Sequence, residues 1–456
     1  MEAPLFPRAF AVDFEDLLRW NVSFFKVGLW NWPVETIRPL SDFAGLESVP
    51  ISAAQAQAQG LSIIAKINFG GELFLRPDED YRKYKGALFL VQPERFIFSK
   101  INARQGCIFH ADAQQKPFVV SSEYPVLRLD AELALGDYVD LALRVGPARE
   151  QLQGGAVGMA KPRTSAEDFL RIQIPLPPLW VQREIVARHQ KVEADARLNR
   201  EQLAALEVEA ELEFLAALGL IKPLQLAMER CFAVEWKDLE RWGVRAMHAL
   251  LNVNFDQSRY PIVTGRDCLA EVKHGSSASP AAKPTKLEVL KISAVTRGFL
   301  DAREKKFAVD KAAVRREYNL REGDVLMCRT NGTLNYVGMS ALIERDLENL
   351  IFPDKLIRLR AQPNLLPEFG WKALQSPPLR SQIEAAARTA VGNYAIGNED
   401  IWDLRIPLPP LPVQRALIAR VRAGRETIKR LRAAGQAHAA QGRAEIEALI
   451  LGEQKL

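Results

Sequence analysis

Residues 174–188 of the sequence are IPLPPLWVQREIVAR, and residues 406–420 are IPLPPLPVQRALIAR, with 11 of the 15 paired positions identical. In each copy two β-type residues lead into a proline-rich corner, and the corner opens a run with helical spacing. Proline fixes φ and lacks a backbone donor, so it is favoured just before or within the first turn of a helix and disfavoured inside it. The stretch therefore predicts a hinge that starts a long helix. The hinge residues are Pro175, Pro177, Pro178 and Gln182 in the first copy, and Pro407, Pro409, Pro410 and Gln414 in the second.

A second repeat marks the other end of each unit. Residues 10–22 and 232–244 are identical at 8 of 13 positions. The chain therefore consists of two cycles of one plan, each with an opening segment, a variable body, a hinge and a long helix. We expect a pseudo-twofold internal repeat. The expected divisions are a first domain at 1–173, a hinge and helix at 174–221, a second domain at 222–405, and a hinge and helix at 406–456.

The two variable bodies carry strand patterns, so the expected fold class is α/β, of the mixed α+β kind. Runs rich in β-branched and aromatic residues lie between turn signals. In the first body they are Ser62–Ile67, Ala87–Val91, Phe96–Ser99, Cys107–His110 and Pro117–Val120. In the second body they are Leu287–Ile292, Asp324–Cys328 and Leu356–Leu359, and Ser381–Arg388 is expected to be helical.

The segments after the hinges have the alternating four-and-three spacing of a coiled-coil seam. The first seam is expected at Ile185, His189, Val192, Ala196, Asn199, Leu203, Leu206 and Ala210. The second is expected at Leu417, Val421, Gly424, Ile428, Leu431, Gly435 and His438. Glycine at Gly424, Gly435 and Gly442 weakens a helix by about 1 kcal/mol each, but it lets a partner helix approach closely.

The charges of the two expected helices are opposite. Residues 180–218 carry a net charge of −3, and residues 411–456 carry +5. Opposite charges favour pairing of the helices with each other into an antiparallel coiled coil. The alternative is that each helix packs separately on its own domain. At about 1.5 Å per residue, helices of about 38 residues would be roughly 57 Å long.

The overall composition is that of an ordinary soluble protein. Of 456 residues, 48% are hydrophobic and 26% charged, and the formal net charge of +5 permits nucleic-acid binding without indicating it. The four cysteines have no metal-ligand or disulfide spacing, so no metal site is expected. The N-terminus lacks the pattern of a secretory signal, and no stretch approaches the length of a membrane span. We expect a cytoplasmic protein without membrane contact.

The doubled hinge before a long helix resembles the specificity (S, HsdS) subunits of type I restriction–modification systems. The R-W-x-V segments at Arg19–Trp20 and Arg241–Trp242 are similar to that family as well. So are 88–109 and 121–127 in the first body, and 269–277, 290–301 and 320–343 in the second, which look like target-recognition domains. The resemblance covers nearly the whole chain.

The resemblance implies a non-catalytic subunit that binds double-stranded DNA. Each of two target-recognition domains would recognise one half of a bipartite target, and the paired helices would set the distance between them. The hinges and helices would dock methyltransferase (modification) subunits, for which the twofold plan suggests two copies, and through them endonuclease (restriction) subunits. No cofactor is expected on this chain, because S-adenosylmethionine would bind the methyltransferase. A related defence-system methyltransferase without restriction is an alternative setting.

The hinge departs from the family at one position. An acidic residue usually precedes the glutamine, but here Val181 and Val413 occupy that place. If the acid contacts a partner subunit or caps the helix, that contact is altered here.

Candidate DNA contacts are polar and cationic loop residues, since Arg pairs well with guanine and Asn or Gln with adenine. In the first body the segment SKINARQG follows a strand, and Tyr81–Lys85 interleaves aromatic and basic residues. In the second body KHGSS and RTNGT are similar loops. Solvated polar turns are the alternative. The candidates are Lys100, Asn102, Arg104, Gln105, Arg82 and Lys83, together with Lys273, His274, Ser276, Ser277, Arg329, Thr330 and Asn331.

The two alternative classes of function are an independent enzyme and a protein–protein scaffold. The sequence has no catalytic N-P-P-Y-type loop, no P-loop and no acidic nuclease triad with a lysine, so independent catalysis is not expected. A protein–protein scaffold without DNA binding would also use two lobes and paired helices. Salt-dependent duplex binding distinguishes the DNA-binding protein from the scaffold.

Overall fold

The computed structural model describes residues 30–76, 86–153, 163–220, 255, 257–277, 279–390 and 392–456. The repeated opening segments 10–22 and 232–244 lie outside these residues, as do Arg82 and Lys83. The chain divides into two compact units, of which the first comprises residues 1–199 and 433–456 and the second comprises residues 200–432. Across the described ranges, no helix is long and apolar enough to cross a membrane.

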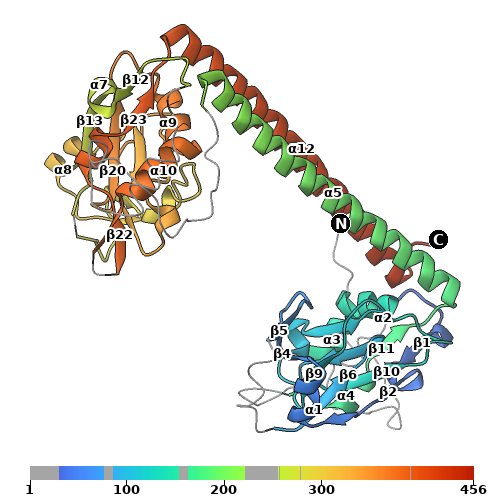
Figure 1. Cartoon of the computed structure of the whole chain (residues 1–456). Coiled ribbons are helices and arrows are strands. Elements are labelled where there is room, and N and C mark those ends of the chain that lie inside the picture. Colours follow the sequence, from blue (N-terminus) through green and yellow to red (C-terminus); the bar gives the residue numbers. More distant parts are fainter. Residues whose placement is uncertain are drawn as a thin grey trace. The chain divides into compact units, whose positions relative to one another are not determined.

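The described residues of the first unit form two larger sheets and one two-stranded sheet, and many of their strands are labelled in Figure 1. The first sheet has the antiparallel order β2-β10-β7-β8, formed by β2 (Ala44–Leu46), β10 (Val126–Leu129), β7 (Arg95–Phe98) and β8 (Ile108–Ala111). The second has the order β3-β6-β9-β4-β5, formed by β3 (Pro50–Ile51), β6 (Leu88–Val91), β9 (Phe118–Ser121), β4 (Ser62–Ile67) and β5 (Leu73–Arg76). Strands β1 (Ile37–Pro39) and β11 (Gln173–Pro175) form a separate pair that leads into the hinge.

Helices and aromatic side chains close the core of the first unit. The short helices are α1 (Ala53–Ala58), α2 (Gly136–Arg144), α3 (Gly146–Gln153) and α4 (Ala166–Leu170). The rings of Phe98 and Phe169 stack with centroids 4.0 Å apart. Tyr138 of α2 is fully buried, and its hydroxyl donates to the carbonyl oxygen of Pro175 at 2.9 Å. The core therefore packs directly against the hinge.

The second unit repeats much of this plan (Figure 1). Its main sheet has the order β13-β20-β16-β18, formed by β13 (Leu269–His274), β20 (Leu356–Ala361), β16 (Val325–Cys328) and β18 (Ser340–Leu342). The smaller sheets are β15-β14-β19 (Lys305–Phe307, Glu288–Leu290, Leu350–Ile351), β17-β22-β21 (Thr330–Asn331, Asn393–Ala395, Arg388–Ala390) and the pair β12-β23 (Ile262–Thr264, Arg405–Pro407). The helices are α7 (Gly265–Cys268), α8 (Ala312–Glu317), α9 (Pro367–Gln375), α10 (Pro377–Ala386) and α11 (Asn398–Trp402).

The strand pairing shows which elements of the two units correspond. Strand β4 pairs parallel with β9 and antiparallel with β5, and β14 pairs in the same way with β19 and β15. The main sheets correspond strand by strand, and each is followed by a helix, α2 or α9. The pseudo-repeat expected from the sequence is therefore present in the fold, and the mixed α and β class is confirmed.

The predicted strands lie close to the observed ones, and one predicted helix is shifted. Ser62–Ile67 is observed as β4, and the other strand predictions overlap β6, β7, β8, β9, β14, β16 and β20. The helix predicted at Ser381–Arg388 instead runs from Pro377 to Ala386, and Arg388 begins β21. Proline in the first turn is preset for a helical start, which explains the earlier beginning.

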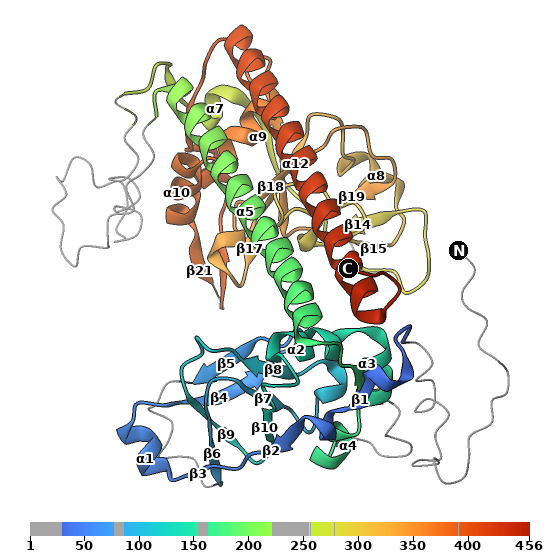
Figure 2. The same cartoon turned by 90° about the vertical axis from the view of Figure 1, so that its right-hand side faces the viewer.

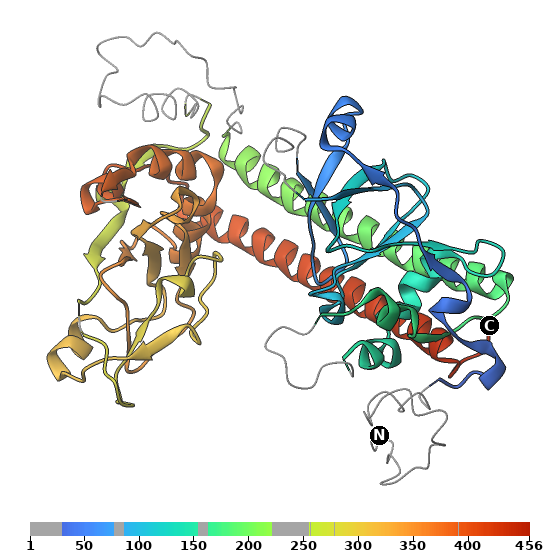
Figure 3. The same ribbon diagram turned by 90° about the horizontal axis from the view of Figure 1, so that it is seen from below.

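The long helices are α5 (Leu179–Leu218) and α12 (Leu411–Leu451), and their segments pair antiparallel within each unit (Figures 2 and 3). In the first unit Arg443 forms an ion pair with Glu193 at 2.8 Å, and in the second Arg432 pairs with Glu207. Each pair joins an acid of α5 to a base of α12, as the opposite net charges predict. Pairing of the two helices with each other is thus confirmed.

The predicted seam is confirmed on α5 and needs a correction on α12. Each predicted position of α5 is buried or half-buried. On α12 the predicted Leu431 and His438 are exposed, and the inward face passes instead through Gly435, Ala439 and Gly442 to Ile446. After Gly435 the next inward-facing residue is Ala439, four positions along, rather than the predicted His438, three positions along. The close contact between the helices then continues at Gly442, where a methyl carbon would lie 2.6 Å from Cγ2 of Val192.

Candidate nucleic-acid interface

Each hinge joins a short strand to the start of a long helix, as the proline pattern predicts. Strand β11 ends at Pro175 and α5 begins at Leu179, while β23 ends at Pro407 and α12 begins at Leu411. Pro178 and Pro410 immediately precede their helices, and their carbonyl oxygens accept the first helical hydrogen bonds. Proline suits this place because a backbone N–H at the start of a helix has no partner within the helix, so the N–H that proline lacks is not missed.

The hinge glutamine fastens the long helix to its own domain. Gln182 is fully buried, and its side-chain oxygen accepts from the backbone N–H of Leu135 at 2.8 Å. Its side-chain nitrogen donates to the carbonyl oxygens of Leu133 at 2.9 Å and Pro177 at 2.7 Å. Leu135 precedes the first residue of α2. Gln182 thereby holds the hinge, the loop before α2 and the start of α5 together.

Gln414 makes the same three hydrogen bonds in the second unit. It accepts from the N–H of Leu366 at 2.7 Å and donates to Asn364 at 2.9 Å and to Pro409 at 2.8 Å. Leu366 precedes α9, as Leu135 precedes α2. Both glutamine side chains are buried and hydrogen-bonded within the chain, so they do not contact a partner subunit directly. They would act on such a subunit only through the shape of the hinge. The docking role of the hinge residues stays a prediction.

The two valines at the usually acidic position face their own domains. Val181 is 6% exposed and packs into the core of the first unit. Val413 is half-buried against the core of the second unit. A carboxylate at Val181 would have to be buried or to turn away from this core. In this chain the position therefore strengthens the attachment of helix to domain.

The first predicted contact segment forms a short ordered loop, which we call cation loop 1 (residues 99–106). Its 3₁₀ turn spans Ala103–Gln105, and Gly106 closes it with a φ of 95°. The N–H of Lys100 donates to the carbonyl of Glu123 at 3.0 Å. Gln105 is exposed, while Lys100, Asn102 and Arg104 are half-buried. Burial lowers the pKa of the Arg104 guanidinium.

The corresponding segment of the second unit is cation loop 2 (residues 329–338). The N–H of Arg329 donates to the carbonyl of Lys355 at 2.9 Å, and Gly338 closes the loop with a φ of 80°. Thr330 and Asn331 form strand β17, and both are half-buried. The guanidinium of Arg329 also donates to the carbonyl of Asp354 at 3.4 Å.

Cation loops 1 and 2 occupy equivalent places in their units. The N–H groups of Lys100 and Arg329 both bond to the turn that precedes the second strand of the main sheet, β10 or β20. The carbonyl of Lys100 accepts from Thr164 at 2.7 Å, and that of Arg329 accepts from Ile396 at 3.0 Å. Two segments chosen separately from the sequence are thus the same structural element, repeated.

The predicted segment Lys273–Ser277 lies beside cation loop 2. The carbonyl of Ser276 accepts from the N–H of Asp354 at 3.0 Å, so both segments border the 353–355 turn. The pKa of His274 is lowered, first by burial and then by the charge of Arg329, while Asp354 opposes the shift. Lys273 is held by Glu317 at 3.0 Å and lies over the ring of Tyr318. Ser277 is exposed, and the exposed Lys355, which no pattern in the sequence singles out, lies in the same turn.

A second pair of equivalent loops was missed from the sequence. Phenylalanine loop 1 (residues 68–72) joins β4 to β5, and phenylalanine loop 2 (residues 291–304) joins β14 to β15. Phe69 is 67% exposed and Phe299 is 52% exposed. Each phenylalanine lies next to glycine, as Phe69–Gly70 and Gly298–Phe299. An apolar residue after a strand looks like core in a sequence, and the adjacent glycines were the available sign of a turn.

In the first unit the phenylalanine loop contacts the cation loop, and in the second it lies near the residue that follows the cation loop. A methyl carbon at Gly106 would come within 2.7 Å of the carbonyl oxygen of Phe69. In the second unit Gly298 lies near Met339, the residue after Gly338, with 3.8 Å between Cε of Met339 and a carbon built on the glycine. Each unit therefore presents one composite edge with cations and an exposed aromatic ring.

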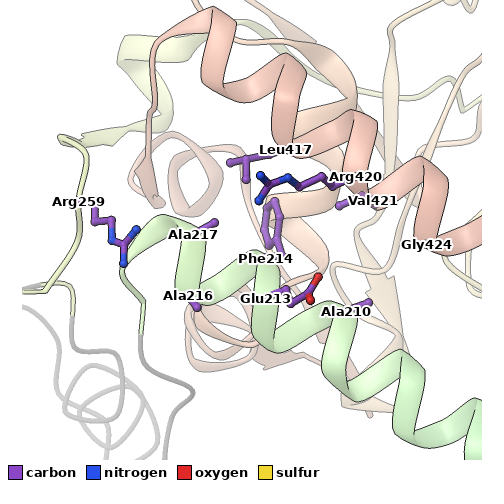
Figure 4. A pocket seen from close by; sticks show the side chains of 10 residues that line it. All are labelled: Ala210, Glu213, Phe214, Ala216, Ala217, Arg259, Leu417, Arg420, Val421 and Gly424. Atoms are coloured by element: carbon purple, nitrogen blue, oxygen red, sulfur yellow. The ribbon is translucent and has the colours of Figure 1, made fainter.

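A groove of about 560 Å³ lies in the second unit, between the end of α5 and the start of α12 (Figure 4). Phe214, Leu417 and Val421 supply apolar lining, and Glu213 and Arg420 supply charge. Gly424 leaves space at this groove. On the adjoining face of α5, Val208 and Leu212 are 52% and 44% exposed. The groove and this stripe form adjoining apolar surface on the helix pair.

Among the described residues, no cluster of His, Cys, Asp and Glu could hold a metal ion. Cys107, Cys268 and Cys328 are buried, and burial raises the pKa of all three thiols, that of Cys328 to about 11. Cys231 lies outside the described residues.

Comparison with known proteins gives two relatives in sequence. The chain is 24% identical over 336 residues to the EcoKI type I restriction enzyme specificity subunit of Escherichia coli strain K12, covering 73% of this chain and 68% of the relative. It is 26% identical over 161 residues to the EcoEI specificity subunit of Escherichia coli, covering 34% of this chain and 27% of the relative. The resemblance to type I specificity subunits is confirmed. No family model matches the sequence.

The fold comparison agrees with this resemblance. One chain of a solved structure superposes on this chain with a TM-score of 0.59 at 16% identity. That structure is described as showing the structural basis of complex assembly and conformational transition of the type I R-M system. The match covers 91% of this chain and 96% of that chain. The chain therefore shares the fold of that chain, in keeping with its mixed α and β units and long helices.

Proposed function

We propose that the chain is the DNA-specificity subunit of a type I restriction–modification complex. The observation that carries the proposal is the repetition of one composite edge in two domains of a specificity-subunit fold. Lys100 and Arg329 hold equivalent positions in the two cation loops, as a bipartite duplex target would need of two related recognition domains. Phosphate contacts would fix the position of each domain, and base contacts would supply its sequence preference.

The predicted contact residues acquire different roles in this proposal. Gln105 and Ser277 are exposed and available for base edges, whereas Arg104 is partly withdrawn and suits a contact made as DNA binds. Lys273 is engaged with Glu317 and Tyr318, so it would have to exchange partners to bind a phosphate. The assignments of Arg82 and Lys83 remain predictions on residues outside the described ranges.

The chain would act by recognition, and its partners would supply the catalysis. S-adenosylmethionine would bind a methyltransferase subunit rather than this chain. The groove at Phe214 and the stripe at Val208 and Leu212 support docking of such a subunit on the helix pair, because exposed apolar surface of this kind favours a protein partner. A twofold plan favours two modification subunits, with restriction subunits joining through them.

A footprint on duplex DNA tests this function. The purified chain assembled with its modification subunits should protect two short patches separated by an unprotected spacer. Its affinity should fall steeply as the salt concentration rises, because phosphate contacts release counterions. A protein–protein scaffold would protect no segment at any salt concentration.

A further inference from the structure

Phe69 and Phe299, the two most exposed phenylalanines among the described residues, lie in corresponding loops of the two domains. Phe69 follows β4 and Phe299 follows β14, the strands that each pair parallel with one neighbour and antiparallel with the next. Single exposed apolar residues are common on protein surfaces and need no explanation by themselves. Here a large aromatic ring is exposed in the corresponding loop of each unit, in bodies of otherwise divergent sequence.

In each unit the last residue of a domain helix, α2 or α9, supports the phenylalanine loop. Arg144, the last residue of α2, donates to the carbonyl of Gly70 at 3.1 Å and to that of Ile108 at 3.2 Å. Gln375, the last residue of α9, donates to the carbonyl of Gly298 at 2.9 Å and to that of Ser340 at 3.3 Å. Ile108 and Ser340 are the first residues of the corresponding strands β8 and β18.

Further hydrogen bonds fix the shape of each loop. In the first, the side-chain oxygen of Asn68 accepts from the N–H groups of Gly70 at 3.0 Å and Glu72 at 2.8 Å. Gly71 has a φ of 82°, and Arg144 occupies the space that a side chain would need there. In the second, Asp301 accepts from the side chain of Arg303 at 3.0 Å. The rings are thus presented from preformed turns, which lowers the entropy cost of using them in binding.

The surroundings suit a nucleic acid better than an apolar protein face. Lys100 and Arg104 lie in the cation loop that contacts the first phenylalanine loop, and Arg297 and Arg303 are exposed in the second loop itself. Acidic side chains, Glu72 in the first loop and Asp301 and Glu304 in the second, accompany them and bond within their own loops. An aromatic ring beside cations can pack on a base or sugar while the cations contact phosphates.

We propose that Phe69 and Phe299 are paired DNA-contacting residues, each packing against bases or sugars of one half-site. The inference rests on the proposed function and names residues that act in it. A ring that packs on a sugar or wedges into a base step of a duplex meets apolar surface in every sequence, so such a contact adds affinity with little preference for sequence. Sequence preference would come from the adjacent cation loop. Each ring would also mark where its domain meets the duplex.

The test uses the full chain assembled with its modification subunits and a duplex that carries its methylated motif. Phe69→Ala and Phe299→Ala should each weaken binding by about tenfold, the effect of losing one stacked aromatic ring. Footprint protection should weaken at one half-site only, and at the opposite one for the other variant. Phe69→Trp should bind as wild type does, and the fluorescence that it adds to that of the eight tryptophans of wild type should be quenched by the specific duplex. Phe307→Ala, an exposed phenylalanine of β15, is the matched control and should bind as the wild type does.

The outcomes separate this inference from the function on which it rests. If the wild-type assembly protects its motif and both alanine variants bind equally well, the inference is wrong and the proposed function stands. If the wild-type assembly protects no duplex, both fall. If an alanine variant fails to assemble, the Phe69→Trp protein decides, since a fluorescence that the specific duplex leaves unchanged contradicts the contact.

Discussion

The side-chain oxygen of Gln182 accepts a hydrogen bond from the backbone N–H of Leu135, across 2.8 Å and 47 residues of sequence. Gln414 and Leu366 repeat the relationship in the second unit. Each bond ties the start of a long helix to the start of a domain helix, α2 or α9. The far end of that domain helix supports the phenylalanine loop. In each unit, one domain helix therefore connects the hinge to the candidate DNA-binding edge.

Replacing Gln182 should destabilise the first unit strongly. In Gln182→Ala three backbone groups lose their partner, one of them buried and two partly buried, and an unsatisfied buried group costs about 1–3 kcal/mol. We expect the free energy of unfolding to fall by about 3 kcal/mol or more, measured by urea denaturation. Arg183→Ala changes the neighbouring exposed residue and should cost less than about 0.5 kcal/mol. Equal losses in the two variants would contradict the bonding role.

A charged replacement at the same position should make stability depend on pH. The carboxylate of Gln182→Glu can accept from Leu135 but cannot donate to Leu133 or Pro177. Burial and these carbonyls would raise its folded-state pKa above the unfolded value of about 4.3. The folded state would then bind more protons, so the deficit against wild type should shrink as pH falls from 7 toward 5. A deficit that stays constant over that range would rule out this explanation.

The glycines of α12 should respond to alanine in opposite directions. In the described structure, a methyl carbon at Gly424 would meet no atom within 4 Å, so Gly424→Ala should raise stability by up to about 1 kcal/mol through helix propensity. At Gly442 the methyl carbon would lie 2.6 Å from Val192, whose branched side chain has little freedom in a helix. Gly442→Ala should lower stability by about 1–3 kcal/mol. Thermal unfolding of both variants would show whether the signs differ.

Acid should weaken the first domain through Asp137. A hydrogen bond with His110 at 3.0 Å is the main cause that lowers the pKa of Asp137, and burial partly opposes it. A depressed carboxyl pKa gives stability that is present above the unfolded value of about 3.9 and is lost as pH falls through the folded value. Asp137→Asn should therefore be less stable than wild type at pH 6, and the gap should close as pH falls through the lowered folded-state pKa of Asp137. A gap that persists below that pKa would assign the effect to packing.

Arg329 should affect only one half of the target. If its guanidinium contacts DNA, Arg329→Ala should weaken binding by about tenfold and relax the sequence preference of the second domain alone. Arg329→Lys distinguishes two kinds of contact, since lysine replaces a phosphate contact but not a bidentate contact to guanine. Competition binding with duplexes altered in one half-site measures both effects. A loss of preference in both half-sites would contradict one domain per half-site.

Local patterns predicted much of the fold. Proline at the hinges, alternating strands and heptad spacing each act over a few residues, so β4, β7 and the starts of α5 and α12 could be located before the structure was known. The seam of α12 was misplaced at Leu431 and His438 because small residues, rather than large apolar ones, make the close contact there. Helix pairing was predictable from charge, since acids lie on one segment and bases on the other.

The candidate site was predictable only in part. Cation loops 1 and 2 could be chosen by composition, but their equivalence rests on backbone bonds to the turns at Glu123 and Lys355, which leave no pattern in the sequence. The bonds of Gln182 and Gln414 span 47 to 50 residues and involve backbone groups of ordinary residues. Phe69 and Phe299 could not be told from core residues, because exposure depends on how the loop turns.

The most direct test of the central claim is methylation-sensitive sequencing of host DNA with and without this gene. Two recognition domains predict gene-dependent methylation of one bipartite motif, with two short specified segments separated by an unspecified spacer. Exchanging residues 1–173 for those of a related subunit should change one segment and leave the other intact. A continuous motif, a change in both segments, or methylation that is indifferent to the gene would contradict the account.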